Sequence, residues 1–465
     1  MVPAKHQELQ RYRVVVFRQD GKDILLVPDG DRFGLPFVEI PRWQRVAANL
    51  TRAVRSDWGK EIVCLFEKGD LPGTHGERIH YQAAEHWRAV GVPMKPTRWV
   101  PARALSEHSF TDASDYLAVQ HSRVQFGADG KTSEAAPFAA LGWFQELQDW
   151  VEGAIAPMGF NLNGSFRQLN ASPSFSLIRF ETDGPALWFK AVGAPNQREF
   201  AITQTLTKWF PDHLAPLIAF RADWNGWLAR EVAGINLSET QEPASWAKAA
   251  ARLAELQVRS IGRDQEILSA GAHDLSFTSL SGLVLPFFET VAKLMDQQSK
   301  IPPPVLTRAE LARMGRVVRE SLDRLGELGV PDTLGHLDLN PDNILVSPLG
   351  CTFLDWAEAY VGQPFLSLQY MIEHLRRAPA GNPSTEKQTV EAYTAVWRRV
   401  LNQHVISQAL AVAPLLAVFA YATASPGWRH PETLAAASAA YLRSLTRRID
   451  REANDLNQRR FLCVC

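Results

Sequence analysis

The sequence predicts an α+β protein in which strand-rich segments come first and a mainly helical part follows. Up to about residue 237, short apolar runs bounded by turn residues recur, a pattern that is typical of strands. From about residue 238, apolar residues repeat at helical spacing, as they do over Ala249–Leu256. A chain of 465 residues is also too long for one ordinary domain and suits roughly two or three.

Residues 1–125 are predicted to form an αβ domain. The apolar runs Arg13–Arg18 and Asp23–Val27 flank Gln19–Lys22, which is a hairpin signal. A helical pattern follows over residues 43–58 and ends at Gly59. The next segment, residues 126–139, is rich in small and turn residues and is interpreted as a linker.

A second αβ unit is predicted for residues 140–237, with strands at Phe166–Asn170, Phe175–Phe180 and Leu187–Val192. The remaining part, residues 238–455, is predicted to be helical apart from one hairpin.

Composition excludes several classes of protein. The formal net charge is −1 and the sequence pI is near 6.9, so nothing indicates a nucleic-acid partner held by bulk charge. No apolar run approaches the roughly 20 residues that span a bilayer, and no membrane partner is expected. The polar start of the chain does not resemble a signal peptide. A cytoplasmic protein fits these properties.

Four cysteines in a chain of this length do not indicate a disulfide framework. Cys64 and Cys351 lie in apolar runs and are predicted to be core residues. Cys463 and Cys465 form a terminal C-x-C, for which a frayed tail and a metal or redox role are both open.

The most informative stretch is His336–Asn343, which reads His-Leu-Asp-Leu-Asn-Pro-Asp-Asn and is followed by a predicted hairpin ending in Leu-Asp-Trp. It places Asp338, then Asn343, then Asp355 after a second short strand. Phosphoryl transfer requires such groups together: one carboxylate orients the attacking hydroxyl, and an amide oxygen and another carboxylate hold the magnesium at the ATP phosphates. Asp and Asn also gather in ordinary turns, but the combination with two apolar strands is more restrictive.

This stretch resembles the aminoglycoside phosphotransferase and choline kinase group, whose loop usually reads His-Gly-Asp-x-x-x-x-Asn. The resemblance implies a two-lobed protein kinase-like fold that uses ATP and Mg²⁺. It also implies that Asp338 is the catalytic base and that Asn343 and Asp355 are the magnesium ligands. Leu337 and Asn340 depart from the family, which has mostly Gly and often His at these positions.

Lys190 lies inside the apolar strand Leu187–Val192, where a lysine is unusual unless it has a fixed counter-charge. Glu199 opens the following helix and is a natural partner, as in the ion pair with which protein kinases place a lysine on ATP phosphates. The alternative is a solvated lysine and a glutamate that complements the helix dipole.

Two further segments are candidate nucleotide contacts. The loop Asn170–Ser174 lies where a turn that covers the phosphates is expected, and Ser172 and Ser174 could contact phosphates, although a plain turn is equally open. The segment Gly226–Leu237 resembles the connection between the two lobes of the family. That resemblance places the purine near Arg230, Glu231 and Val232.

The N-terminal domain shows a fainter resemblance to Nudix hydrolases, carried by Phe33–Pro36 and a following helix. Nudix chemistry requires R-E-x-x-E-E-x-G for its metals, but Ala53 and Ser56 replace two of the acids and leave only Asp57. We therefore expect a Nudix-like domain that has lost hydrolysis. An unrelated αβ module remains the alternative.

Taken together, these features predict a phosphotransferase that moves the γ-phosphate of ATP to a hydroxyl of a small molecule. A nucleotide-binding pseudokinase and a Nudix-type hydrolase with an accessory kinase-like part are the alternatives. The acceptor stays open among antibiotics, sugars, amino alcohols and natural-product intermediates. Glu358 and Glu373 follow the hairpin and could supply an acidic acceptor site, although solvated helices carry similar residues.

Overall fold

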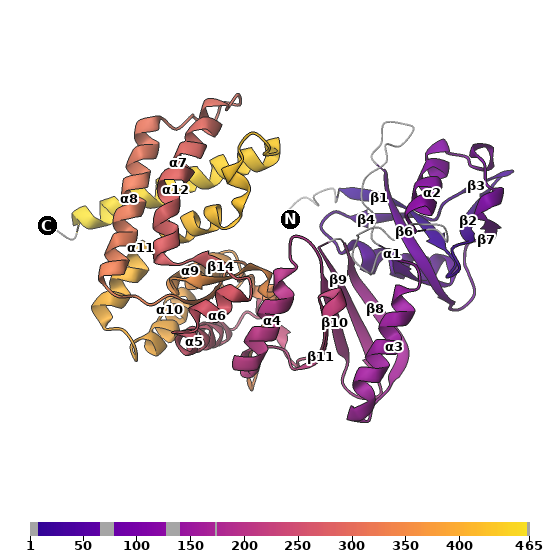
Figure 1. Ribbon diagram of the computed structural model, residues 1–465, viewed down its shortest axis with the longest axis horizontal. Coiled ribbons are helices and arrows are strands. Elements are labelled where there is room, and N and C mark those ends of the chain that lie inside the picture. Colours follow the sequence, from indigo (N-terminus) through magenta and orange to yellow (C-terminus); the bar gives the residue numbers. More distant parts are fainter. Residues whose placement is uncertain (1–7, 66–78, 127–139, 173, 463–465) are drawn as a thin grey trace. The chain divides into compact units, whose positions relative to one another are not determined.

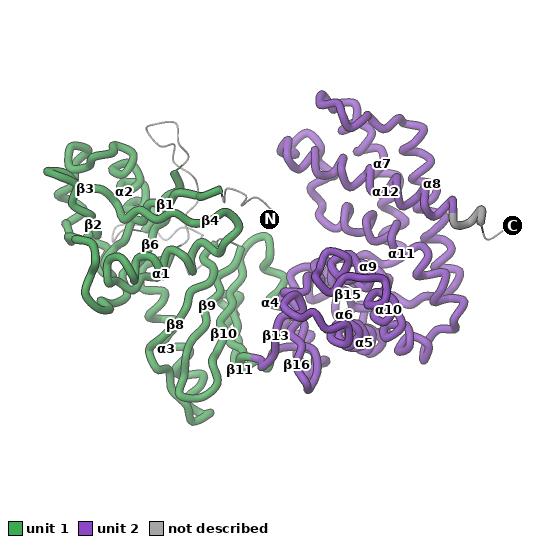
Figure 2. Tube along the Cα trace, turned by 180° about the vertical axis from the view of Figure 1, so that it is seen from behind, with its two compact units in different colours: residues 1–200, 216–231 green, residues 201–215, 232–465 purple. Residues whose placement is uncertain are grey.

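The computed structural model describes residues 8–65, 79–126, 140–172 and 174–462. The chain divides into two compact units, which are coloured green and purple in Figure 2. The first unit comprises residues 1–200 and 216–231, and the second comprises 201–215 and 232–465. Sheets dominate the first and helices the second, which confirms the predicted α+β class.

The first unit begins with a seven-stranded sheet in which the main path runs β3-β2-β1-β6-β5, while β4 pairs with β1 and β7 with β2. Its strands are β1 (Leu9–Phe17), β2 (Asp23–Asp29), β3 (Arg32–Gly34), β4 (Phe37–Pro41), β5 (Lys60–Cys64), β6 (Ile79–Ala89) and β7 (Arg98–Pro101). Two helices accompany it, α1 (Val46–Trp58) and α2 (Ala113–Phe126). The predicted stop signal acts as expected, since Gly59 has a left-handed φ of 60° and donates to the Arg55 carbonyl.

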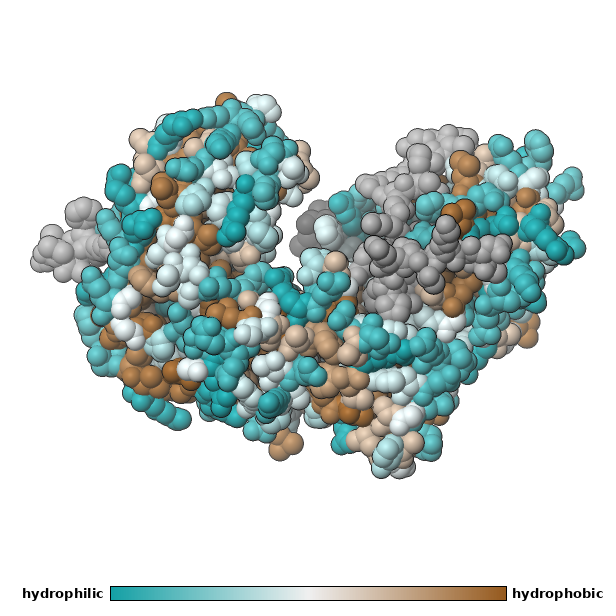
Figure 3. Space-filling view, in the orientation of Figure 1, coloured by the Kyte–Doolittle hydropathy of each residue, from teal (hydrophilic) through white to brown (hydrophobic). Residues whose placement is uncertain are grey.

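A second, five-stranded antiparallel sheet follows in the order β11-β12-β10-β9-β8 (Figure 1). Its elements are α3 (Trp143–Ile155), β8 (Leu162–Ala171), β9 (Phe175–Thr182), β10 (Leu187–Val192), α4 (Arg198–Trp209), β11 (Leu217–Arg221) and β12 (Gly226–Arg230). All three strands predicted here are present. Strand β8 is one edge of this sheet. At the other edge, the half-buried residues of β11 contribute to an apolar area on the face shown in Figure 3.

One hydrophobic core joins the two sheets of the first unit. It contains Val15 and Phe17 of β1, Phe144 of α3, and Phe166 and Phe189 of the second sheet. Because each fully buried side chain of this size contributes roughly 1.5–3 kcal/mol, the sheets stabilise each other. The predicted linker lies, except for Phe126, outside the described residues.

The second unit is built on helices around a single core. They are α5 (Pro243–Ser260), α6 (Asp264–Ser269), α7 (Phe277–Asp296), α8 (Arg308–Glu327), α9 (Phe365–Leu375), α10 (Pro383–Trp397), α11 (Gln403–Ala424) and α12 (Ala436–Leu462). Two three-stranded sheets lie among them, with orders β13-β16-β17 and β14-β18-β15. Their strands are β13 (Ile235–Asn236), β14 (His273–Leu275), β15 (Thr333–His336), β16 (Ile344–Ser347), β17 (Gly350–Phe353) and β18 (Ala359–Gly362).

One described helix, α11, is long and apolar enough by length and composition alone to cross a membrane, which the sequence had not led us to expect. Its most apolar window has a mean hydropathy of 1.9, but 67% of that window is buried inside the protein. Burial of this kind is also typical of the central helix of a globular core.

Candidate active site

The strand that leads into the loop around Asp338 is fixed on several sides. Strand β15 pairs with β18, and its Leu334 N–H and His336 N–H donate to Ser260 Oγ (2.9 Å) and Ser367 Oγ (3.0 Å). A Cβ at Gly335 would lie 2.0 Å from the Tyr360 ring, so only glycine fits there. This packing sets where the next residues emerge.

The two departures from the expected loop both have structural roles. Leu337, where a glycine is usual, buries its side chain in the core, and its N–H donates to the Glu358 carbonyl (3.0 Å). Asn340 accepts a hydrogen bond from the Asp342 N–H (3.1 Å) and so caps a one-turn 3₁₀ helix, Pro341–Asn343. Both residues support the segment that carries Asp338 and Asn343.

Asp338 and Asn343 are in direct contact. The Asn343 amide nitrogen donates to the Asp338 backbone carbonyl (3.1 Å) and lies 3.5 Å from its carboxylate Oδ2. Asp338 is exposed, as a group that meets a substrate must be. Because the nitrogen of Asn343 is turned to Asp338, the oxygen of the same amide is the atom that can ligate a cation.

Asp355 lies at the far end of the same hairpin. Strands β16 and β17 pair from Ile344 opposite Phe353 to Ser347 opposite Gly350, and the Leu354 N–H donates to the Asn343 carbonyl (2.8 Å). Asn343 and Asp355 therefore flank the open end of the hairpin, as the sequence predicted. Asp355 has φ 61° and ψ 63°, a left-handed conformation that is uncommon for residues other than glycine and often marks a functional position.

His336 supports the hairpin through contacts with Leu354 and Trp356. Its imidazole is fully buried, its Nε2 lies 3.1 Å from the Leu354 carbonyl, and its ring packs 5.0 Å from that of Trp356. Burial lowers the pKa of His336, although the charges of Asp338, Asp355 and Glu358 oppose the shift. A neutral ring that donates to Leu354 fits these contacts and holds the segment before Asp355 in place.

The predicted ion pair of the first unit is present. Lys190 Nζ on β10 lies 2.6 Å from Glu199 Oε1 in the first turn of α4. The Glu199 side chain is only 2% exposed, and the Lys190 ammonium lies over the rings of Phe175 (5.5 Å) and Trp227 (5.7 Å). The ammonium is thus held in one place rather than pointing into bulk water.

The β8–β9 turn next to this lysine is closed by its own side chains. The hydroxyls of Ser172 and Ser174 lie 3.1 Å apart, and Ser172 Oγ donates to the Phe175 carbonyl (3.1 Å). Asn170 Nδ2 donates to the same carbonyl (2.8 Å). The serines that we predicted as phosphate contacts therefore also shape the turn, and their contact with phosphates stays a prediction.

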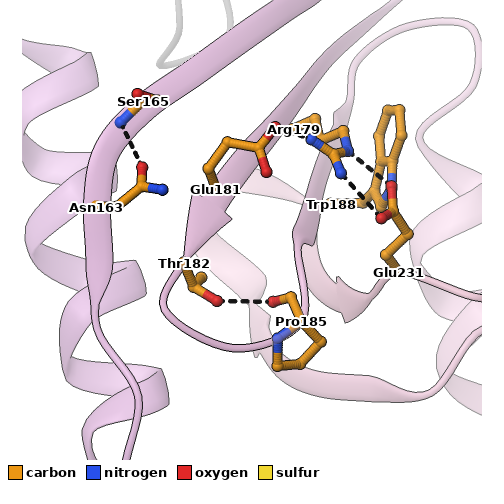
Figure 4. Close-up of polar contacts among 8 residues, drawn as sticks. All are labelled: Asn163, Ser165, Arg179, Glu181, Thr182, Pro185, Trp188 and Glu231. Atoms are coloured by element: carbon orange, nitrogen blue, oxygen red, sulfur yellow. Dashed lines mark hydrogen bonds and ion pairs between the residues drawn. The ribbon is translucent and has the colours of Figure 1, made fainter.

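Glu231 also has a structural partner. Arg179 Nε donates to Glu231 Oε1 (2.6 Å) and Arg179 Nη2 to Oε2 (2.9 Å), while Trp188 Nε1 donates to Oε1 (3.1 Å) (Figure 4). Hydrogen bonding to Arg179 lowers the pKa of Glu231, so the carboxylate stays ionised. Its side chain is committed to the sheet, and any purine contact at Glu231 or Val232 would use the backbone.

Glu358 and Glu373, the glutamates predicted for an acceptor site, differ in their partners. Glu373 is paired with Arg448 and lies 3.9 Å from Arg377, so its charge is compensated. Glu358 Oε2 lies 3.0 Å from His273 Nε2, a contact between residues 85 positions apart that no local pattern indicates.

Tyr421 of α11 is a further residue of this region that the sequence did not reveal. Burial raises its pKa to about 12, and its contact with Tyr441 and the charges of Asp338 and Glu358 act in the same direction. The charge of Asp338 thus acts on Tyr421, although 83 residues separate the two along the chain.

The donor set around the hairpin fits Mg²⁺. Among the described residues, no group of three or more His, Cys, Asp or Glu side chains could hold a metal by itself. Mg²⁺ is usually bound by one or two carboxylates together with substrate phosphates rather than by a complete protein cage. Asp355 and the Asn343 amide oxygen would supply such a partial set.

Asp57, the single acid left in the Nudix-like segment, already has two side-chain partners. Asp57 binds Lys95 through its carboxylate and accepts a hydrogen bond from the Ser56 hydroxyl (2.9 Å). The contact with Lys95 lowers the pKa of Asp57. The Nudix resemblance of this domain itself stays a prediction.

One family model matches part of the chain. Residues 226–401 match the model of the phosphotransferase enzyme family. No curated protein sequence matches the chain.

Solved structures that the chain matches include a macrolide 2′-phosphotransferase from Brachybacterium faecium, 17% identical over 64% of this chain and 98% of that one, with a TM-score of 0.40. A choline kinase from Streptococcus pneumoniae is 15% identical over 67% and 99%, with a TM-score of 0.43. An ethanolamine kinase from Plasmodium vivax is 13% identical over 75% and 91%, with a TM-score of 0.41. The segment that holds Asp338, Asn343 and Asp355 thus carries the sequence pattern of the phosphotransferase enzyme family.

Proposed function

We propose that this protein is an ATP- and Mg²⁺-dependent phosphotransferase that moves the γ-phosphate to a hydroxyl of a small molecule. The observation that carries the proposal is the hydrogen-bonded pair of Asp338 and Asn343 at one end of a hairpin whose other strand leads to Asp355. This arrangement lies inside the segment that matches the phosphotransferase enzyme family.

In the proposed reaction, the Asp338 carboxylate accepts a hydrogen bond from the acceptor hydroxyl and takes its proton as the new O–P bond forms. The bond between the γ-phosphorus and the bridging oxygen breaks, and ADP leaves. Asn343 restrains Asp338 through the observed contact, so the base meets the substrate already oriented.

Asn343 and Asp355 would hold the magnesium ion, which when bound neutralises charge on the phosphates. Lys190, fixed by Glu199, would supply a second cation for the phosphates. Ser172 and Ser174 of the β8–β9 turn would contact the phosphates, and the backbone of Glu231 and Val232 would accept the purine.

The test is a phosphate-transfer screen of the full-length protein over hydroxyl-bearing compounds, including aminoglycosides, macrolides, sugars and amino alcohols. Any acceptor found is then tested with Asp338→Asn and with Asp342→Asn. Asp342 lies in the same loop but binds the Ser238 hydroxyl, so it is a matched control. We expect Asp338→Asn to lose at least about 100-fold in kcat while ATP binding persists, and Asp342→Asn to remain active.

Other outcomes would favour the alternatives. Mg²⁺-dependent ATP binding without transfer to any acceptor would support a nucleotide-binding pseudokinase. Pyrophosphate hydrolysis that persists in Asp355→Ala would support a Nudix-type enzyme. Full activity of Asp338→Asn would exclude Asp338 as the base.

A further inference from the structure

The β8–β9 turn is coupled to Lys190 through the sheet. Phe175, the first residue after the turn, pairs with Val192 on β10, and the Gly193 N–H donates to the Ser174 carbonyl (2.9 Å). The Phe175 ring also lies 5.5 Å from the Lys190 ammonium. A displacement of this turn would therefore change the surroundings of the cation proposed to hold the phosphates.

Strand β8, which carries the turn, is an edge strand, and edge strands are held by hydrogen bonds on one side only. Here side-chain contacts join this strand to the N-terminal domain. Gln168 on β8 is 1% exposed, and its side-chain amide makes two hydrogen bonds to the backbone of Cys64. Its Nε2 donates to the Cys64 carbonyl (3.0 Å), and its Oε1 accepts from the Cys64 N–H (2.7 Å). Both polar atoms of a buried side chain are thus used to join β8 to β5.

A second contact holds the beginning of β8. Arg88 on β6 donates from Nη2 to the Gly164 carbonyl (2.6 Å) while its Nε donates to Glu61 Oε2 (2.6 Å). Glu61 also binds Arg55, at 3.2 Å, but no hydrogen bond or ion pair joins Arg55 to β8 among the described residues. The two arginines share one carboxylate, and Arg88 is the one that reaches the second sheet.

A third contact lies at the turn itself. Helix α1 packs along β8, and Ala171, the last residue of β8, packs against the core cluster that contains Leu50 and Val54 of α1. The N-terminal domain therefore contacts β8 at its start, its middle and its end.

From these contacts we propose that residues 8–126 are a positioning domain that holds the β8–β9 turn over the nucleotide phosphates, with Gln168 and Arg88 as its positioning residues. The nucleotide part of this inference rests on the proposed function. A domain with a merely stabilising role would change the melting temperature alone, whereas a positioning domain also sets the KM for ATP.

The test compares full-length Arg88→Ala with full-length Arg55→Ala. Both remove one partner of Glu61, but only the first also removes a hydrogen bond to β8. We expect Arg88→Ala to raise the KM for ATP about fivefold or more, with the acceptor KM unchanged, and Arg55→Ala to leave both constants near wild type. Gln168→Met, which keeps side-chain length but removes both hydrogen bonds, should act in the same direction as Arg88→Ala.

Hydrogen exchange of the turn without nucleotide is an independent readout. Arg88→Ala and Gln168→Met should speed exchange of the Ser172 and Phe175 amides, and Arg55→Ala should not. Unchanged exchange in both release variants would overturn the positioning role whether or not the protein transfers phosphate. Faster exchange with an unchanged KM for ATP would overturn the link to the nucleotide. A wild-type protein that neither binds nor uses ATP would refute the proposed function and with it that link, while exchange still decides whether the domain holds the turn.

Discussion

The Asn343 amide nitrogen donates to the Asp338 backbone carbonyl at 3.1 Å and lies 3.5 Å from its carboxylate. One side chain thus has two tasks, since its nitrogen restrains the proposed base and its oxygen is a proposed ligand for magnesium. These tasks belong to different atoms of the same amide, so substitutions can separate them.

Asn343→Asp should separate them. A carboxylate can still ligate a cation, but it cannot donate to Asp338 and places a second negative charge beside it. We expect Mg²⁺-dependent ATP binding within about tenfold of wild type and kcat reduced about 100-fold or more. Asn343→Ala should lose both. Titration calorimetry with Mg-ATP and single-turnover transfer measure the two effects, and normal turnover of Asn343→Asp would contradict the restraint.

Asp355 is a proposed magnesium ligand, and its backbone conformation also costs free energy. Its φ of 61° is unfavourable for any side chain and easy for glycine. Asp355→Ala and Asp355→Gly should both abolish Mg²⁺-dependent nucleotide binding. The glycine variant should nevertheless have a higher free energy of unfolding than the alanine variant, by about 1 kcal/mol, when both are measured in urea. Equal stabilities would show that the conformation costs little.

The pair of Lys190 and Glu199 should control ATP affinity. Lys190→Met keeps much of the side-chain volume, removes the cation and leaves a nearly buried glutamate, so we expect the KM for ATP to rise about tenfold or more and the melting temperature to fall. Lys208→Met is the matched control, because Lys208 lies in the last turn of α4 and is exposed. Steady-state kinetics at saturating acceptor give the KM for ATP of both variants. Equal KM values would contradict a role of Lys190 in binding ATP.

His213 predicts acid sensitivity of the second unit. Its side chain is fully buried, and burial, with the charges of Arg252 and Arg259, lowers its pKa to about 4. Between pH 6.5 and about 4, the unfolded chain binds a proton at this position that the folded protein does not, so stability falls as the pH falls through this range. Above about pH 6.5, His213 should contribute no pH dependence.

Replacing this histidine should remove part of that sensitivity. We expect the unfolding free energy of His213→Leu to fall less between pH 6.5 and 4 than that of wild type, in urea titrations at several pH values. If the unfolding free energy of His213→Leu fell with pH as steeply as that of wild type, His213 would already be protonated in the folded state.

The sequence predicted features formed by residues that are close along the chain, and it did not predict contacts between distant residues. The β16–β17 hairpin was predictable because two apolar runs flank a turn signal, and the Lys190–Glu199 pair because a strand lysine and a helix-start glutamate are only nine residues apart. The contact of Gln168 with Cys64 spans 104 residues, and no local pattern specifies which strand edge a glutamine closes.

The serines of the β8–β9 turn show a second limit. Their place was predicted correctly, but composition cannot tell whether a hydroxyl in a turn faces a ligand or closes the turn itself. Ser172 bonds within the turn because the Phe175 carbonyl lies within its reach.

A substitution at Gly335 tests how tightly the loop that carries Asp338 is supported. A Cβ at this position would lie 2.0 Å from the Tyr360 ring, whereas at Gly350 in the same unit nothing lies within 4 Å. Gly335→Ala must therefore push β15 away from β18, at a cost of about 3 kcal/mol or more, and displace Asp338, which follows three residues later. Gly350→Ala should cost well under 1 kcal/mol. Urea unfolding of both variants gives the difference, and a stable, active Gly335→Ala would show that the loop does not depend on this packing.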